Sequence, residues 1–500
     1  MKIRNTIIKT SLACLSLVAV QSCNNDFLDT TPTTSVGEQT IYSSGENLLT
    51  AINGMHRRAN TGRYYNQGTY GISGHMITME AMADDVVWPH QGNGWYVSEQ
   101  RWTGVVNEAS TQVAFPWEFW YQLIKNANAI IKFGPAAGGD QTKKEQALGE
   151  AYAYRAHGMF QMVQVYGSRY IKGGGNTQPG VVIRLDPNDI SPLGRSSVEE
   201  VYAQIWSDLA EAEKYLKGKT KLNASHFNYN TVKGIQARVA LTQGDWAKAS
   251  AAAAEAKNGY ALMTNAQYKS GFNNSDNSEW IWGTKSQEDQ SEAFAMFHSY
   301  MARNALSTNV RQAPKTMNKA LYEAFPATDV RKQLVDPTGE HTGYVFPAAG
   351  YSKFPYTTMK FLIAGAAQGL VAADTPYMRS AEMYLTEAEA LARQGKDAEA
   401  RTVFALLEKN RNPSYVTTTA SGDALLQEIL LSRRIELWGE GFRFFDLKRM
   451  NLPLDRTKAG NYVTSVINNL YKVDANDNRW NWLIPRQEIN TNPEVKQNPL

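Results

Sequence analysis

The chain has 500 residues, of which 43% are apolar and 11% aromatic, and its formal net charge is +3. Lys2, Arg4 and Lys9 account for this whole excess, and the rest of the chain carries 48 basic and 48 acidic residues. Such a balance gives no electrostatic reason to expect nucleic acid or an anionic membrane surface as partner, so a neutral ligand is expected. The two cysteines, Cys14 and Cys23, are too few for a disulfide framework.

Residues 1–22 have the pattern of an export signal, in which a basic start is followed by an apolar stretch. Ser22 stands directly before Cys23, which indicates a lipoprotein signal whose removal leaves the Cys23 thiol to be acylated. An ordinary secretory signal remains the alternative, because Gln21 fits the lipoprotein pattern imperfectly. No later stretch approaches the ~18–20 apolar residues of a transmembrane helix, so we expect membrane attachment through the lipid alone.

A polar tether is predicted at 23–45, followed by one domain at 46–500. Helical periodicity is clearest at 119–133, 144–166, 198–216, 229–257 and 377–411. The helix at 198–216 has Ser196 or Ser197 as its expected N-cap, and the one at 144–166 is expected to end at Gly167.

Two of these segments, 229–257 and 377–411, are similar to each other, and each is predicted to form two helices joined at a glycine. When they are overlaid, Ala237, Gly244 and Ala249 fall on Ala388, Gly395 and Ala400. Small residues on facing helices, with glycine at the turn, are typical of tetratricopeptide-type hairpins.

The predicted fold class is therefore mainly α. A tetratricopeptide-like helical hairpin scaffold is expected at about 116–258 and 377–450. Long, irregular, loop-rich insertions that carry few short strands are expected at about 60–115 and 260–376.

The last part of the chain carries the most specific pattern. Residues 432–449 (SRRIELWGEGFRFFDLKR) closely resemble the C-terminal signature of the SusD/RagB family, outer-membrane nutrient-binding lipoproteins of the Bacteroidota. Residues 483–493 (LIPRQEINTNP) and the start of the mature chain, with Cys23 and then residues 26–29 (DFLD), are similar to that family as well.

Charged residues alternate with aromatic and aliphatic ones through 433–449. We interpret these charges as ion pairs that hold the fold together, in preference to a catalytic arginine and glutamate cluster. Ser432 departs from the family pattern, in which an acidic residue precedes the arginine pair, and this departure is expected to alter local ion pairing.

The resemblance implies a SusD-like domain that is lipid-anchored in the outer membrane and faces the cell surface. It also implies a non-catalytic role, in which a glycan, or in some members a peptide, is presented to a TonB-dependent, SusC-like transporter. No cofactor is expected, and a structural calcium ion is left open.

A sugar-binding surface needs aromatic rings, on which the C–H faces of sugars stack, next to side chains that hydrogen bond to hydroxyls. The glycine-rich segment 84–96 has this composition, and it is predicted to be a loop that carries the binding platform. The expected ligand contacts are Trp88, Trp95 and Tyr96, with His90, Gln91 and Asn93 as polar partners. Alternatively, Trp88 or Trp95 packs the insertion onto the scaffold. Further along the chain, the resemblance implies contacts from Tyr300, Arg303 and Asn304.

The residues also allow three alternatives to glycan binding. A glycoside hydrolase needs two carboxylates that flank the scissile bond, and Glu80, Asp84 and Asp85 lie near the aromatic loop. A helical-repeat scaffold for outer-membrane assembly is the stronger alternative, and a peptide ligand is another. No metal site is expected, because the seven histidines are scattered and form no H-E-x-x-H motif.

Overall fold

The computed structural model describes residues 41–500 except 291, 293 and 365–372. The predicted leader, Cys23 and most of the predicted tether therefore lie outside the described residues. No helix in the part of the chain that the structure describes is long and apolar enough to span a bilayer.

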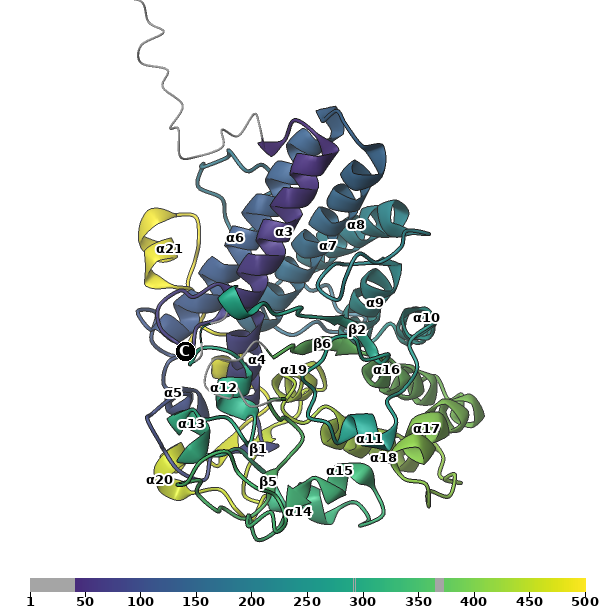
Figure 1. Ribbon diagram of the computed structural model, residues 1–500. Helices are drawn as coiled ribbons and strands as arrows, with labels where there is room; N and C mark the ends of the chain where they lie inside the picture. Colours follow the sequence, from purple (N-terminus) through teal and green to yellow (C-terminus); the bar gives the residue numbers. More distant parts are fainter. Residues whose placement is uncertain (1–40, 291, 293, 365–372) are drawn as a thin grey trace, which may run out of the picture.

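The fold is mainly α, and its long helices form one continuous layer (Figure 1). Helices that pack as neighbours, such as α7 on α8 and α10 on α16, carry this layer from one end to the other. Its members are α3 (Gly45–Thr61), α6 (Thr111–Phe133), α7 (Gln141–Tyr166), α8 (Val198–Leu216), α9 (Tyr229–Gln243), α10 (Trp246–Ala256), α16 (Ser380–Arg393), α17 (Asp397–Arg411) and α18 (Gly422–Glu436).

The helical hairpins predicted from the repeated segments are confirmed. Gly244 joins α9 to α10 at φ +73°, and Gly395 joins α16 to α17 at φ +74°, a left-handed conformation that glycine adopts without steric cost. The paired alanines Ala237, Ala249, Ala388 and Ala400 are all fully buried. Small side chains thus let the helices of each hairpin approach closely.

Local capping signals explain where the predicted helices begin and end. Ser197 caps α8 in a reciprocal capping box with Glu200, and Gly167 follows the last residue of α7. The helix α6 begins at Thr111, earlier than predicted, because the Ser110 hydroxyl accepts a hydrogen bond from the Val113 amide and caps it there.

Shorter elements lie beside the layer (Figure 1). The short α-helices are α4 (Gly71–Ala81), α5 (Val97–Gln100), α11 (Asn265–Tyr268), α12 (His298–Met301), α13 (Thr308–Arg311), α14 (Lys319–Glu323), α15 (Val330–Gln333), α19 (Arg443–Arg449), α20 (Thr464–Ile467) and α21 (Arg486–Thr491). Single 3₁₀ turns are formed by η2 (Gly134–Ala136), η3 (Glu288–Gln290) and η4 (Asn478–Trp480).

The strands are few and short, and they pair segments that are distant in sequence. One antiparallel sheet has the order β1 (Val86–Val87), β3 (Thr316–Met317), β5 (Thr357–Thr358) and β4 (Val335–Asp336). A second pairs β2 (Trp280–Gly283) with β6 (Pro376–Arg379), and a third pairs β7 (Leu454–Asp455) with β8 (Lys472–Val473). Since β6 leads directly into α16, the second sheet attaches the loop-rich part of the chain to the helical layer.

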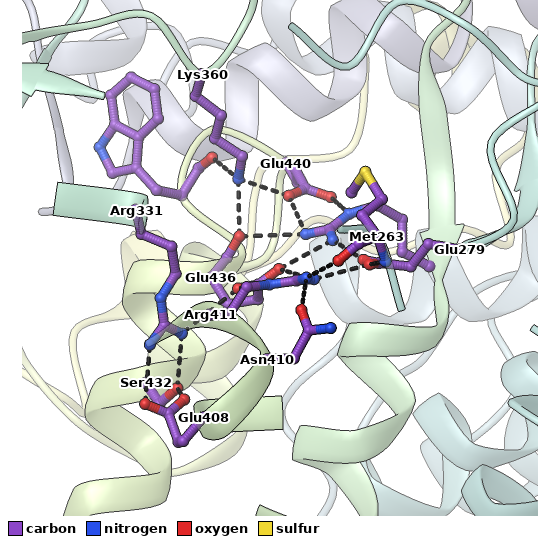
Figure 2. Close-up of polar contacts among 12 residues, drawn as sticks. Met263, Glu279, Arg331, Lys360, Glu408, Asn410, Arg411, Ser432, Glu436 and Glu440 are labelled. Carbon is purple, nitrogen blue, oxygen red and sulfur yellow. Dashed lines mark hydrogen bonds and ion pairs between the residues drawn. The ribbon is translucent and has the colours of Figure 1, made fainter. Parts of the chain in front are cut away.

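A buried network of ion pairs lies where α15, α17, α18 and β6 meet (Figure 2). Glu436, at the end of α18 and fully buried, contacts Arg379 at 3.0 Å, Arg411 at 3.1 Å and Arg331 at 3.4 Å. The remaining charged members are Glu279, Asp329, Lys360, Glu408 and Glu440. Burial opposes the charged form of Glu436, but the three arginines outweigh it and hold the pKa of its carboxyl well below the usual range.

A second group of ion pairs lies in the C-terminal signature. Asp446 contacts Arg433 and Arg449, each at 2.8 Å, and Arg449 also contacts the buried Glu389 at 2.7 Å. The structural interpretation of the 433–449 charges is thus confirmed. Ser432 donates a hydrogen bond to Glu408, so a carboxylate of α17 supplies the acidic group that the signature lacks at this position.

We predict that Glu436→Gln lowers the free energy of unfolding by about 3–5 kcal/mol, because it leaves three buried arginines short of negative charge. Urea denaturation followed by tryptophan fluorescence measures this change. The matched control is Glu428→Gln, an exposed position on the same helix, which should change stability by less than about 0.5 kcal/mol. Equal effects of the two substitutions would contradict the assigned role of Glu436.

Candidate functional site

The chain that follows β1, residues 88–96, forms a surface loop built on sharp turns. Gly92 and Gly94 have φ +54° and +85°, and Tyr96 adopts φ +61°, all in the left-handed region. Asn93 Nδ2 donates to Thr308 Oγ1 at 2.7 Å, and Gln91 Nε2 donates to the Ser465 carbonyl at 3.2 Å. The loop is thus held to α13 on one side and to α20 on the other.

Trp95 is the aromatic ring of this loop that faces outward. It is half-buried, and its ring meets the edge of Tyr300 at a centroid distance of 6.2 Å. Trp95 also lines a cavity of about 190 Å³, together with Thr69, Ser98 and Glu99. An indole held against a tyrosine next to hydroxyl and carboxylate groups can stack on a sugar ring and hydrogen bond to its edge.

The expectation of an exposed ring is wrong for Trp88 and Tyr96. Trp88 is 1% exposed and Tyr96 is 5% exposed. Because Val87 pairs with Thr316 in the β1–β3 ladder, Lys315 comes to lie over the Trp88 ring, at 4.9 Å from Nζ to the ring centroid. Tyr96 points inward and donates from its hydroxyl to the Gly68 carbonyl at 3.0 Å. Trp88 therefore packs the loop onto the sheet, whereas the alternative interpretation from the sequence placed such a ring against the helical scaffold.

The three predicted polar partners are exposed on the same loop as Trp95. His90 stacks on Phe354 at 6.3 Å, and its Nδ1 accepts a hydrogen bond from the Gly92 amide. Gln91 and Asn93 are exposed, and each uses its side-chain nitrogen to hold the loop.

The second predicted group, Tyr300, Arg303 and Asn304, is buried beneath this surface. Tyr300 contacts both Trp95 and Tyr96, whereas Asn304 is engaged in two hydrogen bonds with the backbone of Ile363. The predicted ligand contacts from these three residues stay a prediction, and Tyr300 reaches the loop only from beneath it.

Aromatic rings that were not predicted as part of a site cover the guanidinium of Arg303. Its guanidinium is 4.5 Å from the centroid of Phe346 and 5.6 Å from that of Tyr351, and Nη2 donates to the Ser352 carbonyl. Among the described residues, Nε and Nη1 of Arg303 have no hydrogen-bond partner. The closely spaced aromatic residues of 344–351 are the sequence feature from which this cover could have been predicted.

The carboxylates that suggested a hydrolase hold the C-terminal signature in place. Asp85 pairs with Arg434 at 2.6 Å, and Asp84 pairs with Arg443 at 2.6 Å. Glu80 accepts hydrogen bonds from the amides of Gly441 and Phe442. All three are at most 5% exposed, so they are not placed to flank a bound sugar.

One group of side chains has the composition of a metal site, although the scattered histidines gave no sign of it in the sequence. The ligand atoms of His56, Glu150 and His226 all lie within 4.8 Å of one another, in the interior of the helical layer. The group lies on different elements from the 88–96 loop.

Comparisons with known proteins find SusD and SusD-like proteins. Residues 339–500 match a family model described as the SusD family, and residues 26–241 match one described as "Starch-binding associating with outer membrane". The chain is 24% identical to SusD-like protein P38 of Formosa agariphila, over 98% of both chains. It is 22% identical to SusD-like protein P2 of the same organism, over 87% of this chain and 89% of that protein.

Solved structures share the fold. A SusD-like carbohydrate binding protein from Bacteroides vulgatus superposes with a TM-score of 0.78 at 24% identity, over 91% of this chain and 98% of that chain. A structure described as a laminarin binding SusD-like protein superposes with a TM-score of 0.68 at 21% identity, over 92% of this chain and 100% of that chain. The mainly α, SusD-like fold predicted from the sequence is thus confirmed.

The buried Glu80 generates a prediction about pH. Burial, and then the charge of Asp85, raise the pKa of Glu80 to about 8, above its ordinary value of 4.5. Between about pH 5 and pH 8 the folded protein therefore retains a proton that the unfolded chain has lost, and stability falls as pH rises. We expect Glu80→Gln to lose less stability than the wild type between pH 5 and pH 8.

Urea denaturation at the two pH values measures this difference. The control is Glu494→Gln, at an exposed position, which should follow the wild-type pH dependence. If the stability of Glu80→Gln shows the wild-type dependence on pH as well, Glu80 does not titrate as the structure indicates.

Proposed function

We propose that this chain is a member of the SusD family that binds a glycan at the cell surface and delivers it to a TonB-dependent, SusC-like transporter in the outer membrane. The helical layer would face the transporter, and the 88–96 loop would face the ligand. Delivery requires capture and release only, so no bond of the glycan is broken.

The half-buried Trp95 is the observation that supports glycan binding most directly. Its ring is braced from behind by Tyr300, and the exposed His90, Gln91 and Asn93 lie on the same loop. A rigid ring loses little conformational freedom on binding, and the neighbouring polar groups supply hydrogen bonds to hydroxyls. The equal numbers of acidic and basic residues after the leader also suit an uncharged ligand.

The carboxylates near the loop support a binding role without catalysis. Hydrolysis would require one carboxyl to protonate the leaving group and a second to act on the opposite face of the sugar. Asp84 and Asp85 are paired with arginines, and Glu80 is buried under Gly441 and Phe442. Their ion pairs and hydrogen bonds with the C-terminal signature account for their burial.

We predict that Trp95→Ala weakens glycan binding about tenfold or more, which corresponds to about 1.4 kcal/mol. Isothermal titration calorimetry against a panel of soluble glycans measures the loss. Laminarin belongs in this panel because a structurally similar protein is described as laminarin binding. Trp246→Ala, at a half-buried tryptophan of α10, is the matched control and should bind as the wild type does.

Two outcomes would overturn parts of this proposal. Unchanged affinity in Trp95→Ala would place the glycan elsewhere on the molecule. A shorter glycan after incubation with the purified protein, detected by mass spectrometry, would refute the non-catalytic role.

We also predict that Cys23→Ser moves the protein from the membrane fraction to the soluble fraction, because the acylated thiol is the proposed attachment. Cell fractionation followed by immunoblotting measures this change. Cys14→Ser, within the leader, should leave the protein in the membrane fraction. Retention of Cys23→Ser in the membrane fraction would refute the lipid anchor. Absence of a TonB-dependent transporter from detergent co-purifications of the wild type would refute the proposed partner.

A further inference from the structure

Two histidines and one glutamate from three separate parts of the helical layer converge in its interior. His56 lies on α3, Glu150 lies on α7, and His226 lies in the turn that leads into α9. Their exposed fractions are 9%, 0% and 4%. His56 Nε2 and His226 Nδ1 each lie 2.7 Å from one oxygen of Glu150, and the two nitrogens are 3.3 Å apart.

The donor types are those that a transition-metal ion takes. Imidazole nitrogens and carboxylate oxygens are both ligands of divalent cations in proteins. Here two ring nitrogens and a carboxylate meet in one buried place.

Among the described residues, no lysine or arginine reaches the Glu150 carboxylate at ion-pair distance, since Lys221, whose charge acts on Glu150 from farther away, donates to the Ile281 carbonyl. The contacts of the carboxylate are His56, His226, the Gln146 amide and the Phe227 backbone. A fully buried carboxylate without a cation is costly, and a bound metal ion would supply the missing positive charge.

The spacing of the two nitrogens fits a tetrahedral ion. With metal–nitrogen bonds of about 2.0–2.1 Å, two ligands at a tetrahedral angle stand about 3.3 Å apart. The observed separation of the two ring nitrogens is 3.3 Å. The Glu150 oxygens are closer to the nitrogens than this, so the carboxylate would withdraw by about half an ångström when the ion binds.

Hydrogen bonds from outside the group orient His56 and Glu150. The Tyr154 hydroxyl lies 2.6 Å from Nδ1 of His56, on the opposite side of the ring from the cluster. Gln146 donates to one oxygen of Glu150 at 2.7 Å, and the Phe227 amide donates to the other at 3.0 Å. Such outer contacts fix ring orientation and are typical of metal-binding histidines and carboxylates.

We propose that His56, Glu150 and His226 bind one Zn²⁺ ion. Two imidazoles and a carboxylate suit zinc, whereas calcium and magnesium prefer sets of oxygen ligands. Because the ligands come from α3, α7 and the turn before α9, the ion fastens these three elements to one another. The fourth tetrahedral position would be filled by the second oxygen of Glu150 or by a water molecule. Because all three side chains are buried and join three elements, the role is structural, and the site is independent of the proposed glycan binding.

Metal-stripped, untagged protein titrated with ZnCl₂ in a calorimeter tests the proposal. The expected result is uptake of one ion per chain, with a Zn²⁺-dependent rise in the thermal unfolding midpoint. His226→Gln should abolish both effects. His75→Gln, at another buried histidine, and His90→Gln, at an exposed one, should retain them. Absence of stoichiometric uptake by the wild type would overturn the proposal, as would normal uptake by His226→Gln.

Tyr154→Phe keeps the proposal falsifiable if His226→Gln does not fold. This substitution retains the packing of the ring and removes the hydrogen bond to His56, so Zn²⁺ affinity should fall about tenfold or more. Co²⁺ loaded in place of Zn²⁺ reports the geometry, and the wild type should give the visible absorption of a tetrahedral complex. Unchanged Zn²⁺ affinity in Tyr154→Phe, or an octahedral Co²⁺ spectrum in the wild type, would refute the assignment.

Discussion

Buried charge around Glu436 is the constraint on which the rest of the molecule depends. Taking four cations and five carboxylates out of water is expensive, and the cost is recovered only when every member has its partners. The members come from α15, α17, α18, β6 and four connecting segments, so a packing that misplaces any of these elements leaves a buried charge unpaired. Ion pairs here select one arrangement of the chain, while apolar burial supplies the driving force.

The same charged signature positions the candidate ligand loop. Arg434 and Arg443 hold Asp85 and Asp84, the two residues directly before β1, and Trp438 Nε1 donates to the Asp85 carbonyl at 2.9 Å. The 88–96 loop therefore follows residues that the C-terminal signature holds in place. The charged C-terminal signature can thus determine the position of Trp95 without itself contacting a ligand.

The sequence predicts elements whose signals are local, and it fails where the outcome depends on distant partners. The helix at 198–216 was predicted with its observed bounds, because Ser197 and Glu200 cap it within one turn. Gly244 and Gly395 marked the hairpins for a similar reason, since a left-handed turn favours glycine. The composition of the 88–96 loop identified a surface feature and the exposed positions of its polar side chains.

Orientation within that loop could not be read from composition. Whether Trp88 or Trp95 faces solvent is decided by the pairing of Val87 with Thr316, which lies 229 residues away. The cluster of His56, Glu150 and His226 is hidden for the same reason, because Glu150 is separated from the two histidines by 94 and 76 residues. No spacing rule for metal ligands covers such distances.

The two-residue strands of the β1–β3–β5–β4 sheet carry a consequence for the order of folding. Each helical hairpin closes a short loop and can form as soon as its own residues are available. In the sheet, Val86–Val87 pairs with Thr316–Met317, and Thr316 pairs with Thr357. Formation of the sheet therefore closes a very long loop, which lowers the conformational entropy of the chain. The helical layer is thus able to assemble early, and the surface around Trp95 is completed among the last parts of the molecule.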